Sequence, residues 1–131
     1  MDLAKFIDET ISGKDAAPEP LNAEEQAFAA EFNNADSRSG ELDKLRFKCV
    51  IRKSGRCGFA SGGSIDYVVN TDPGASYTVT VRTHWRQGIN SGQYDRVYNL
   101  PAGYRKQLGC TDSGAIPVAY YNRSVVGEER S

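Results

Sequence analysis

Residues 77–86 read YTVTVRTHWR, and along them side chains suited to a protein interior alternate with polar and charged ones. Successive side chains of a β-strand point to opposite faces. One face of an extended chain here therefore carries Tyr77, Val79, Val81, Thr83 and Trp85. Such alternation is typical of a strand with one buried and one solvated face. This stretch predicts a half-buried strand of an antiparallel sheet.

The same two-residue period recurs over residues 45–52 and 65–70. Further runs rich in Tyr, Val and Ile follow at 93–99, 104–110 and 116–126. Turn-forming residues fall between or beside the runs, at 54–55, 61–63, 72–74, 91–92 and 112–114. Six or seven short strands of this kind predict a mainly β chain folded as an antiparallel sandwich.

One stretch adds detail to this fold. Residues 97–110 read VYNLPAGYRKQLGC, which predicts a strand, a Pro/Gly corner and a returning strand. The stretch resembles the crossing between sheets in immunoglobulin-like sandwiches of bacterial proteins. The resemblance implies an immunoglobulin-like sandwich and carries no activity with it. The Cys…Trp…Cys spacing of antibody domains is not reproduced, because Trp85 lies too far beyond Cys49.

Charge divides the chain into two parts. Residues 1–43 hold eleven acidic and three basic residues, a net charge of −8, whereas residues 44–131 hold six acidic and thirteen basic residues, a net charge of +7. The overall net charge of −1 hides this asymmetry, which concerns partners rather than fold. We expect an acidic arm over residues 1–41 and a basic β-sandwich over residues 42–131.

The acidic arm is expected to be partly helical. Within residues 2–11 an apolar stripe follows the helical period, and it consists of Leu3, Phe6, Ile7 and Ile11. Residues 12–20 contain two prolines and no apolar period, as in a linker.

A second helix is predicted over residues 23–33. Asn22 is a favourable N-cap residue, and Glu25 stands where a capping box requires it. Phe28 and Phe32 are one helical turn apart and can contact each other. Residues 33–41 are turn and loop formers.

The two parts of the chain are expected to pack together. Opposite charges orient the arm on the sandwich, although single surface ion pairs contribute only ~0–1 kcal/mol. Burial of the arm's large apolar side chains, at roughly 1.5–3 kcal/mol each, must hold it there. The alternative is a mobile arm that folds on a partner.

The three cysteines form neither a CxxC pair nor a metal-binding cluster with histidine, so no metal site is predicted. Cys49 and Cys110 fall on inward-facing sets and are expected to be small buried thiols, or a disulfide in an oxidising compartment. Cys57 follows Arg52, Lys53 and Arg56, whose charges can make a thiol reactive. A Cys49–Cys57 bridge is not expected, because a two-residue turn at 54–55 would place Cys49 opposite Ala60.

No catalytic residue and no cofactor site is predicted. His84 is the only histidine, and it stands between Arg82 and Arg86 on the polar face of its strand. It is expected to be a solvated residue; the alternative is a general base without an identifiable partner. The glycine-rich residues 58–64 match neither phosphate-binding glycine pattern, and no carboxylate pair suggests glycoside chemistry.

One basic surface is predicted. Arg46, Lys48 and Arg52 share one side of their strand, and Arg82, His84 and Arg86 share the polar side of another. If the two strands are neighbours in one sheet, these side chains form a continuous positive patch that tyrosines can extend. The alternative is a sheet face that charge keeps solvated.

These features favour a non-enzymatic protein-interaction module. Its candidate partner-binding residues are Leu3, Phe6, Ile7, Ile11, Phe28, Phe32, Arg46, Lys48, Arg52, Arg82, His84 and Arg86. The first rival is a nucleic-acid or anionic-glycan binder regulated by the arm, and the second is a small enzyme that uses Cys57 or His84. Residues 1–11 show no secretory signal and no stretch approaches the ~20 apolar residues of a membrane span, so a cytoplasmic location without a membrane partner is expected.

Overall fold

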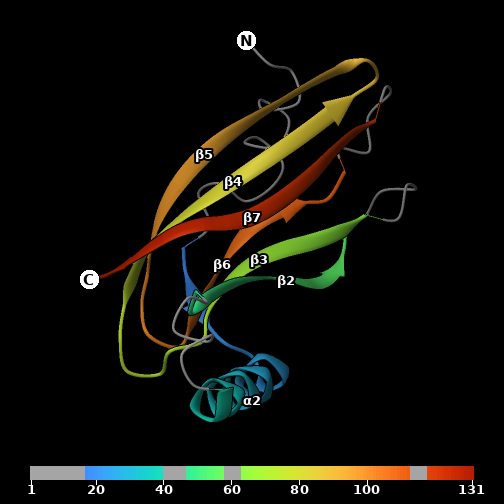
Figure 1. Cartoon of the computed structure of the whole chain (residues 1–131). Coiled ribbons are helices and arrows are strands. Elements are labelled where there is room, and N and C mark those ends of the chain that lie inside the picture. Colours follow the sequence, from blue (N-terminus) through green and yellow to red (C-terminus); the bar gives the residue numbers. More distant parts are fainter. Residues whose placement is uncertain (1–16, 40–46, 58–62, 113–117) are drawn as a thin grey trace.

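The computed structural model describes residues 17–39, 47–57, 63–112 and 118–131. Within these residues two antiparallel sheets pack face to face as a sandwich, and one helix lies outside them (Figure 1). The predicted mainly β sandwich is confirmed.

The four-stranded sheet has the order β1-β6-β3-β2, where β1 is Glu19–Pro20, β6 is Tyr104–Cys110, β3 is Ser64–Asn70 and β2 is Cys49–Arg56. The three-stranded sheet has the order β5-β4-β7, where β5 is Asn90–Leu100, β4 is Tyr77–Gln87 and β7 is Ala119–Arg130. Strand β4 is the central strand that the alternation of residues 77–86 predicts, and its odd-numbered residues are buried.

The main core lies between the sheets and draws on both. Its fully buried side chains include Cys49, Val68, Val79, Val81 and Leu100. A smaller cluster lies toward the β4–β5 turn and contains Trp85, Ala119 and Tyr121, with Tyr94 packed against it. Gly92 is required there, because a Cβ atom at this position would come within 2.8 Å of the Trp85 ring.

Two predicted turns are wrong. Ser54 and Gly55 lie within β2, where Gly55 has a φ of 81° and the pairing with β3 shifts between Lys53 and Arg56. The residues form a β-bulge instead of a turn. The β4–β5 turn falls at residues 88–89 and not at 91–92, because Gly88 supplies a positive φ of 59° at the first position of a two-residue turn.

The predicted crossing between sheets is confirmed. The chain leaves the three-stranded sheet at Leu100 and enters the four-stranded sheet at Tyr104. The Tyr104 amide donates to the Pro101 carbonyl over 3.2 Å, and Gly103 adopts the positive φ that the tight corner needs.

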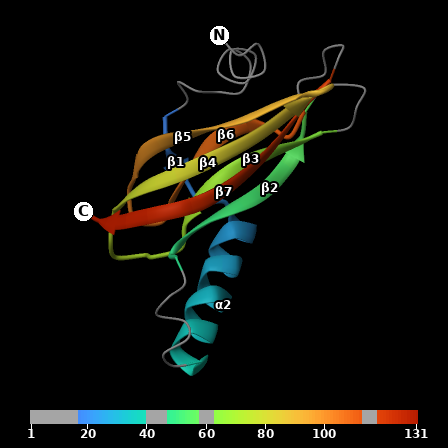
Figure 2. The ribbon, with the colours of Figure 1, turned by 45° about the horizontal axis from the view of Figure 1, so that its top comes forward.

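Helix α2 (Ala23–Ser39) lies beside β2 and β3, on the side away from the three-stranded sheet (Figures 1 and 2). The capping box is confirmed: the Glu25 amide donates to Asn22 Oδ1 over 2.8 Å and the Asn22 amide donates to Glu25 Oε1 over 3.0 Å. The helix continues past its predicted end at residue 33. Asn33 Nδ2 donates to the Thr71 carbonyl over 2.7 Å, a tertiary contact that outweighs the weak helix propensity of this segment.

Candidate interaction surfaces

The acidic arm docks on the four-stranded sheet through Arg105. Its guanidinium donates to Glu19 over 2.8 Å and to Glu25 over 3.0 Å, and it lies 4.1 Å from the centre of the Tyr67 ring. Burial acts to lower the pKa of Arg105, but the bond and charge of Glu25, with the charge of Glu19, raise it. Beside these ion pairs, Leu21 belongs to one apolar cluster with Ala29, Tyr67 and Val69. The predicted packing of the arm on the sandwich is confirmed for this part of it.

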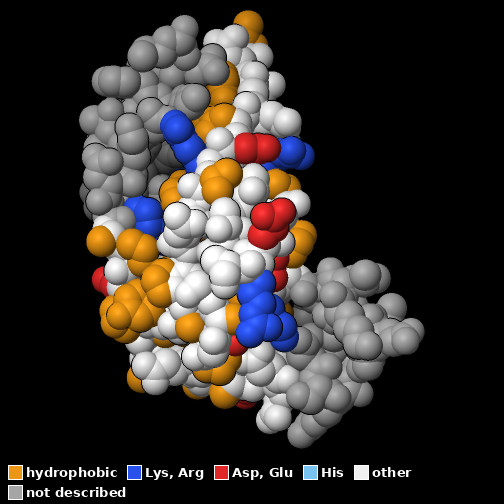
Figure 3. Space-filling model, turned by 90° about the vertical axis from the view of Figure 1, so that its left-hand side faces the viewer, with side chains coloured by type: hydrophobic (Ala, Val, Ile, Leu, Met, Phe, Trp, Pro, Cys, Tyr) orange, Lys and Arg blue, Asp and Glu red, His pale blue; other side chains and the backbone are white. Residues whose placement is uncertain are grey.

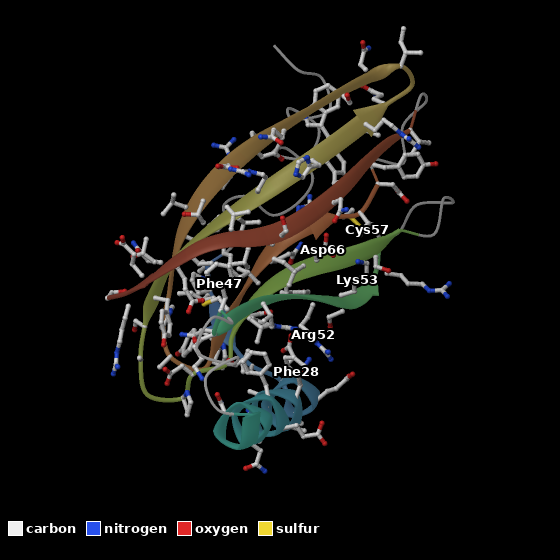
Figure 4. The ribbon with its side chains drawn as sticks, viewed as in Figure 1. Phe28, Phe47, Arg52, Lys53, Cys57 and Asp66 are labelled. Carbon is white, nitrogen blue, oxygen red and sulfur yellow. A yellow bond between two sulfur atoms is a disulfide. The ribbon has the colours of Figure 1, made fainter. Side chains whose placement is uncertain are left out.

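Two of the predicted partner-binding residues contact each other instead. The Arg52 guanidinium lies 4.0 Å from the centre of the Phe28 ring, between β2 and α2 (Figure 4). The Phe28 and Phe32 rings are 5.9 Å apart, and both side chains are half-buried. This contact helps to fix α2 on the sheet. Leu3, Phe6, Ile7, Ile11 and Arg46 lie outside the described residues.

The prediction of a continuous positive patch is wrong. Arg52 belongs to β2 in the four-stranded sheet, whereas Arg82, His84 and Arg86 belong to β4 in the three-stranded sheet. The chain crosses between the sheets after β3, so β2 and β4 are not neighbours. Lys48 is half-buried just before β2, and its amide donates to Glu128 over 3.0 Å.

The outer face of the three-stranded sheet carries the rest of the predicted basic residues. Arg82 makes two hydrogen bonds to Asp95, at 2.9 and 3.2 Å, which raise the pKa of Arg82 and lower that of Asp95. His84 and Arg86 are exposed beside this pair. The charge on this face is therefore partly neutralised.

Apolar side chains are exposed on the same sheet. The large hydrophobic residues that are exposed within the described ranges are Ile89, Val97, Tyr120 and Val126, with exposures of 101%, 63%, 55% and 39%. Ile89 is in the β4–β5 turn, and the other three are on β5 and β7. Val97 pairs with Thr80, and Tyr120 pairs with Arg86. Sequence reasoning missed this mixed surface, since single apolar residues on a polar strand face give no periodic signal.

A cavity of about 330 Å³ opens between α2 and two loops of the sandwich. Helix residues Ala29, Ala30 and Asn33 line one side, and Thr71, Pro73 and Gly103 line the other. This volume is at the lower end of the range for small-ligand sites. No sequence motif indicated it, because three separate segments form it.

The prediction of a small buried thiol is confirmed for Cys49, whereas Cys57 and Cys110 differ from their predictions. Cys57 and Cys110 form a disulfide, and Cys49 is a buried free thiol. The predicted alternative of a Cys49–Cys110 bridge is wrong. The prediction of a reactive thiol at Cys57 is also wrong, since the Cys57 sulfur is bonded to that of Cys110. Burial first, and then the Glu128 carboxylate, raises the pKa of the Cys49 thiol to about 12.

An ion pair lies buried beside the disulfide. Arg123 donates to Asp66 Oδ2 and to the Cys110 carbonyl, each over 2.9 Å. Lys53 Nζ is 3.8 Å from the other Asp66 oxygen (Figure 4). Both Arg123 and Asp66 are almost wholly buried, so the pair joins the two sheets and is closed to a ligand.

Among the described residues no group of three or more His, Cys, Asp and Glu side chains could hold a metal ion. No described helix has the length and apolar character to cross a membrane. The chain matches no protein-family model, no curated protein and no solved structure.

Proposed function

We propose that this chain is a non-enzymatic interaction module that binds another protein through the outer face of the three-stranded sheet. One observation carries the proposal: every large hydrophobic side chain exposed within the described ranges lies on this sheet or its hairpin turn. Aromatic residues and arginine are enriched at protein–protein interfaces, and Tyr120 and Arg86 pair on this face.

The charge pattern favours a protein over a polyanion. Arg82 is paired with Asp95, and Glu129 stands beside Thr78 at the other end of the sheet. Acidic, basic and hydrophobic side chains also mix on the face shown in Figure 3. The alternative, a nucleic-acid or anionic-glycan binder, rests on the adjacent His84, Arg86 and Tyr120.

We assign the sandwich to the immunoglobulin-like kind on its strand order. Neighbouring strands β2-β3-β6 and β4-β7 follow the order of strands A-B-E and C-F of that fold. Three features differ from the seven-stranded form. Strand β5 lies beside β4 as strand C′ does, and β1 takes the place of strand D although it precedes the others in the chain. No strand of the described residues lies beside β7 where strand G would be.

The cytoplasmic location stays a proposal that the disulfide weighs against. Disulfides form and persist in oxidising compartments and are rare in the cytosol. Fractionation of the native host locates the protein. Thiol alkylation of each fraction then determines whether Cys57 and Cys110 are joined in a disulfide there.

The test of partner binding compares three baits in one native-host lysate: wild type, Val97→Lys/Tyr120→Ser, and Glu31→Lys as a control on the exposed side of α2. We expect one partner to bind wild type and the control and to be lost from the double variant. A partner that the double variant retains contradicts the proposal. The polyanion alternative is tested by titration with heparin at two salt concentrations, where a steep salt slope supports it.

A further inference from the structure

The Trp85 cluster, which comprises Trp85, Tyr94, Ala119 and Tyr121, contains no hydrophobic residue of the opposite sheet. All its members lie on the three-stranded sheet, and Trp85, Ala119 and Tyr121 are 7%, 0% and 5% exposed. The main core, by contrast, takes Cys49, Val68 and Leu108 from the opposite sheet. A sheet face buries its side chains only against a second layer. The Arg123 guanidinium, which binds Asp66 of that sheet, lies 5.3 Å from the centre of the Tyr121 ring. The rest of the cluster must be covered by something other than the described hydrophobic residues of the four-stranded sheet.

Polar contacts at the cluster indicate the character of that layer. Nε1 of Trp85 is buried and has no hydrogen-bond partner. The Arg96 guanidinium lies 5.4 Å from the centre of the neighbouring Tyr94 ring. An apolar segment suits these neighbours, because it covers the rings and supplies no acceptor to the indole N–H.

The course of the chain brings the N-terminal residues to this place. Strand β1 is antiparallel to β6 and lies on its outer edge, so the chain before Glu19 leads toward the Cys110 end of β6. A bridge between Asp112 and Tyr120 places that end beside the Trp85 cluster.

The distances also fit. Lys106 of β6 lies 5.8 Å from the Tyr98 ring, which places these two residues at one level of the sandwich. Tyr94 is four residues farther along β5, about 13 Å at ~3.3 Å per residue. Residues 12–16, if extended, span up to about 17 Å.

We infer that residues 3–11 of the same chain dock on the Trp85 cluster through the stripe Leu3, Phe6, Ile7 and Ile11. The two other segments outside the described residues at this end, 58–62 and 113–117, each hold a single large apolar residue, Phe59 and Ile116. This docking uses the inner face of the sheet and is independent of the partner surface on its outer face.

Trp85 is the only tryptophan, so its fluorescence reports on this cluster alone. In the full chain, Phe6→Ser/Ile7→Ser is expected to shift Trp85 emission to the red and to raise its quenching by acrylamide toward that of the unfolded chain. Lys5→Ser/Glu9→Ser, in the same segment but outside the stripe, is the matched control and is expected to leave the emission and the quenching of Trp85 unchanged.

Each other outcome overturns the proposal. Unchanged quenching in the stripe variant removes the arm as the covering layer. Exposure of Trp85 by Phe59→Ser, with none by the stripe variant, assigns the cover to residues 58–62. Acrylamide quenching of Trp85 that falls as the protein concentration rises assigns the cover of the cluster to a second copy of the chain.

Amide hydrogen exchange keeps the proposal falsifiable if the stripe variant fails to fold. In the wild-type chain we expect protection at residues 3–11, lost in Trp85→Ser while the amides of β3 stay protected. Rapid exchange throughout residues 1–16 of the wild type overturns the docking.

Discussion

Arg123 and Asp66 show how a single residue pair can hold two sheets together. The arginine comes from β7 and the aspartate from β3, and their side chains are 1% and 2% exposed. A buried ion pair adds little net stability over an apolar pair, but removal of one partner leaves a charge without compensation. The carbonyl of Cys110, a member of the disulfide, is a further acceptor for Arg123.

Arg123→Met is expected to lower the free energy of unfolding by about 3–5 kcal/mol, because Asp66 stays buried and, among the described residues, Lys53 is its one other ion-pair partner. Urea denaturation at neutral pH measures the change. The double variant Asp66→Asn/Arg123→Met should lose less than the single one, and Arg86→Met, an exposed control, should change stability by no more than about 0.5 kcal/mol. An equal loss in the single and double variants contradicts the role of the unpaired charge.

Asp72 predicts a loss of stability in acid. Burial acts to raise its pKa, but hydrogen bonds from the Gly74 amide and the Tyr77 hydroxyl, with the nearby charge of Arg130, lower it. A carboxyl whose folded-state pKa is lowered stabilises the fold above its unfolded pKa of about 3.9, and this contribution disappears as the pH falls through the folded value.

Asp72→Asn is therefore expected to weaken the dependence of stability on pH between about pH 5 and pH 2. Urea midpoints across this range measure it. Glu31→Gln, whose side chain is exposed on α2, is the control and is expected to keep the wild-type slope. A wild-type slope in Asp72→Asn would refute the assignment.

At the scale of elements, the capping box decides where α2 begins. Asn22→Ala removes the acceptor for the Glu25 amide and is expected to cost about 1 kcal/mol. The effect should be seen as faster amide exchange in the first turns of α2 and as a lower thermal midpoint. Glu31→Ala, exposed on the same helix, is the control. Exchange that increases equally in both variants would show general loss of the helix instead of loss of the cap.

The elements that the sequence could predict are those with a local physical signal. Strand β4 follows from its strict alternation, and the start of α2 follows from Asn22 and Glu25. The end of α2 does not follow from the sequence, because the hydrogen bond from Asn33 to Thr71, far away along the chain, extends the helix. The bulge in β2 was taken for a turn, since Ser54-Gly55 suits both.

The candidate surface was harder to predict than the strands. Arg52 and Arg82 each lie on an outward strand face, as the alternation indicates. Their separation depends on which sheet each strand joins, and the crossing after β3 decides that. No local pattern in residues 71–76 states the sheet to which the chain goes next.

At the scale of the whole molecule, the two sheets differ in what covers them. Helix α2 packs on the outer face of the four-stranded sheet, whereas no described helix lies on that of the three-stranded sheet. One side of the sandwich is closed by Glu128 of β7, which accepts hydrogen bonds from the amides of Lys48 and Cys49. The disulfide ties the strands β2 and β6 at the other end, across β3.

The disulfide predicts how the whole molecule responds to reduction. Cys57 and Cys110 are 53 residues apart, and cross-links over loops of this size typically stabilise a fold by about 2–4 kcal/mol. Cys49→Ala removes the free cysteine, so that only the disulfide responds to a reductant. In this variant the free energy of unfolding, measured in urea with and without reductant, is expected to differ by this amount.

Thiol counts on protein isolated from its host supply the control. Alkylation at pH 8 should leave the folded protein unmodified, because burial and Glu128 raise the pKa of Cys49 to about 12 and its side chain is inaccessible. Denaturant alone should expose one thiol, and denaturant with reductant three. Three thiols without reductant would mean that the bridge does not form in the native compartment. The sandwich would then depend on its core, the Asp66–Arg123 pair and the Glu128 contacts for its stability.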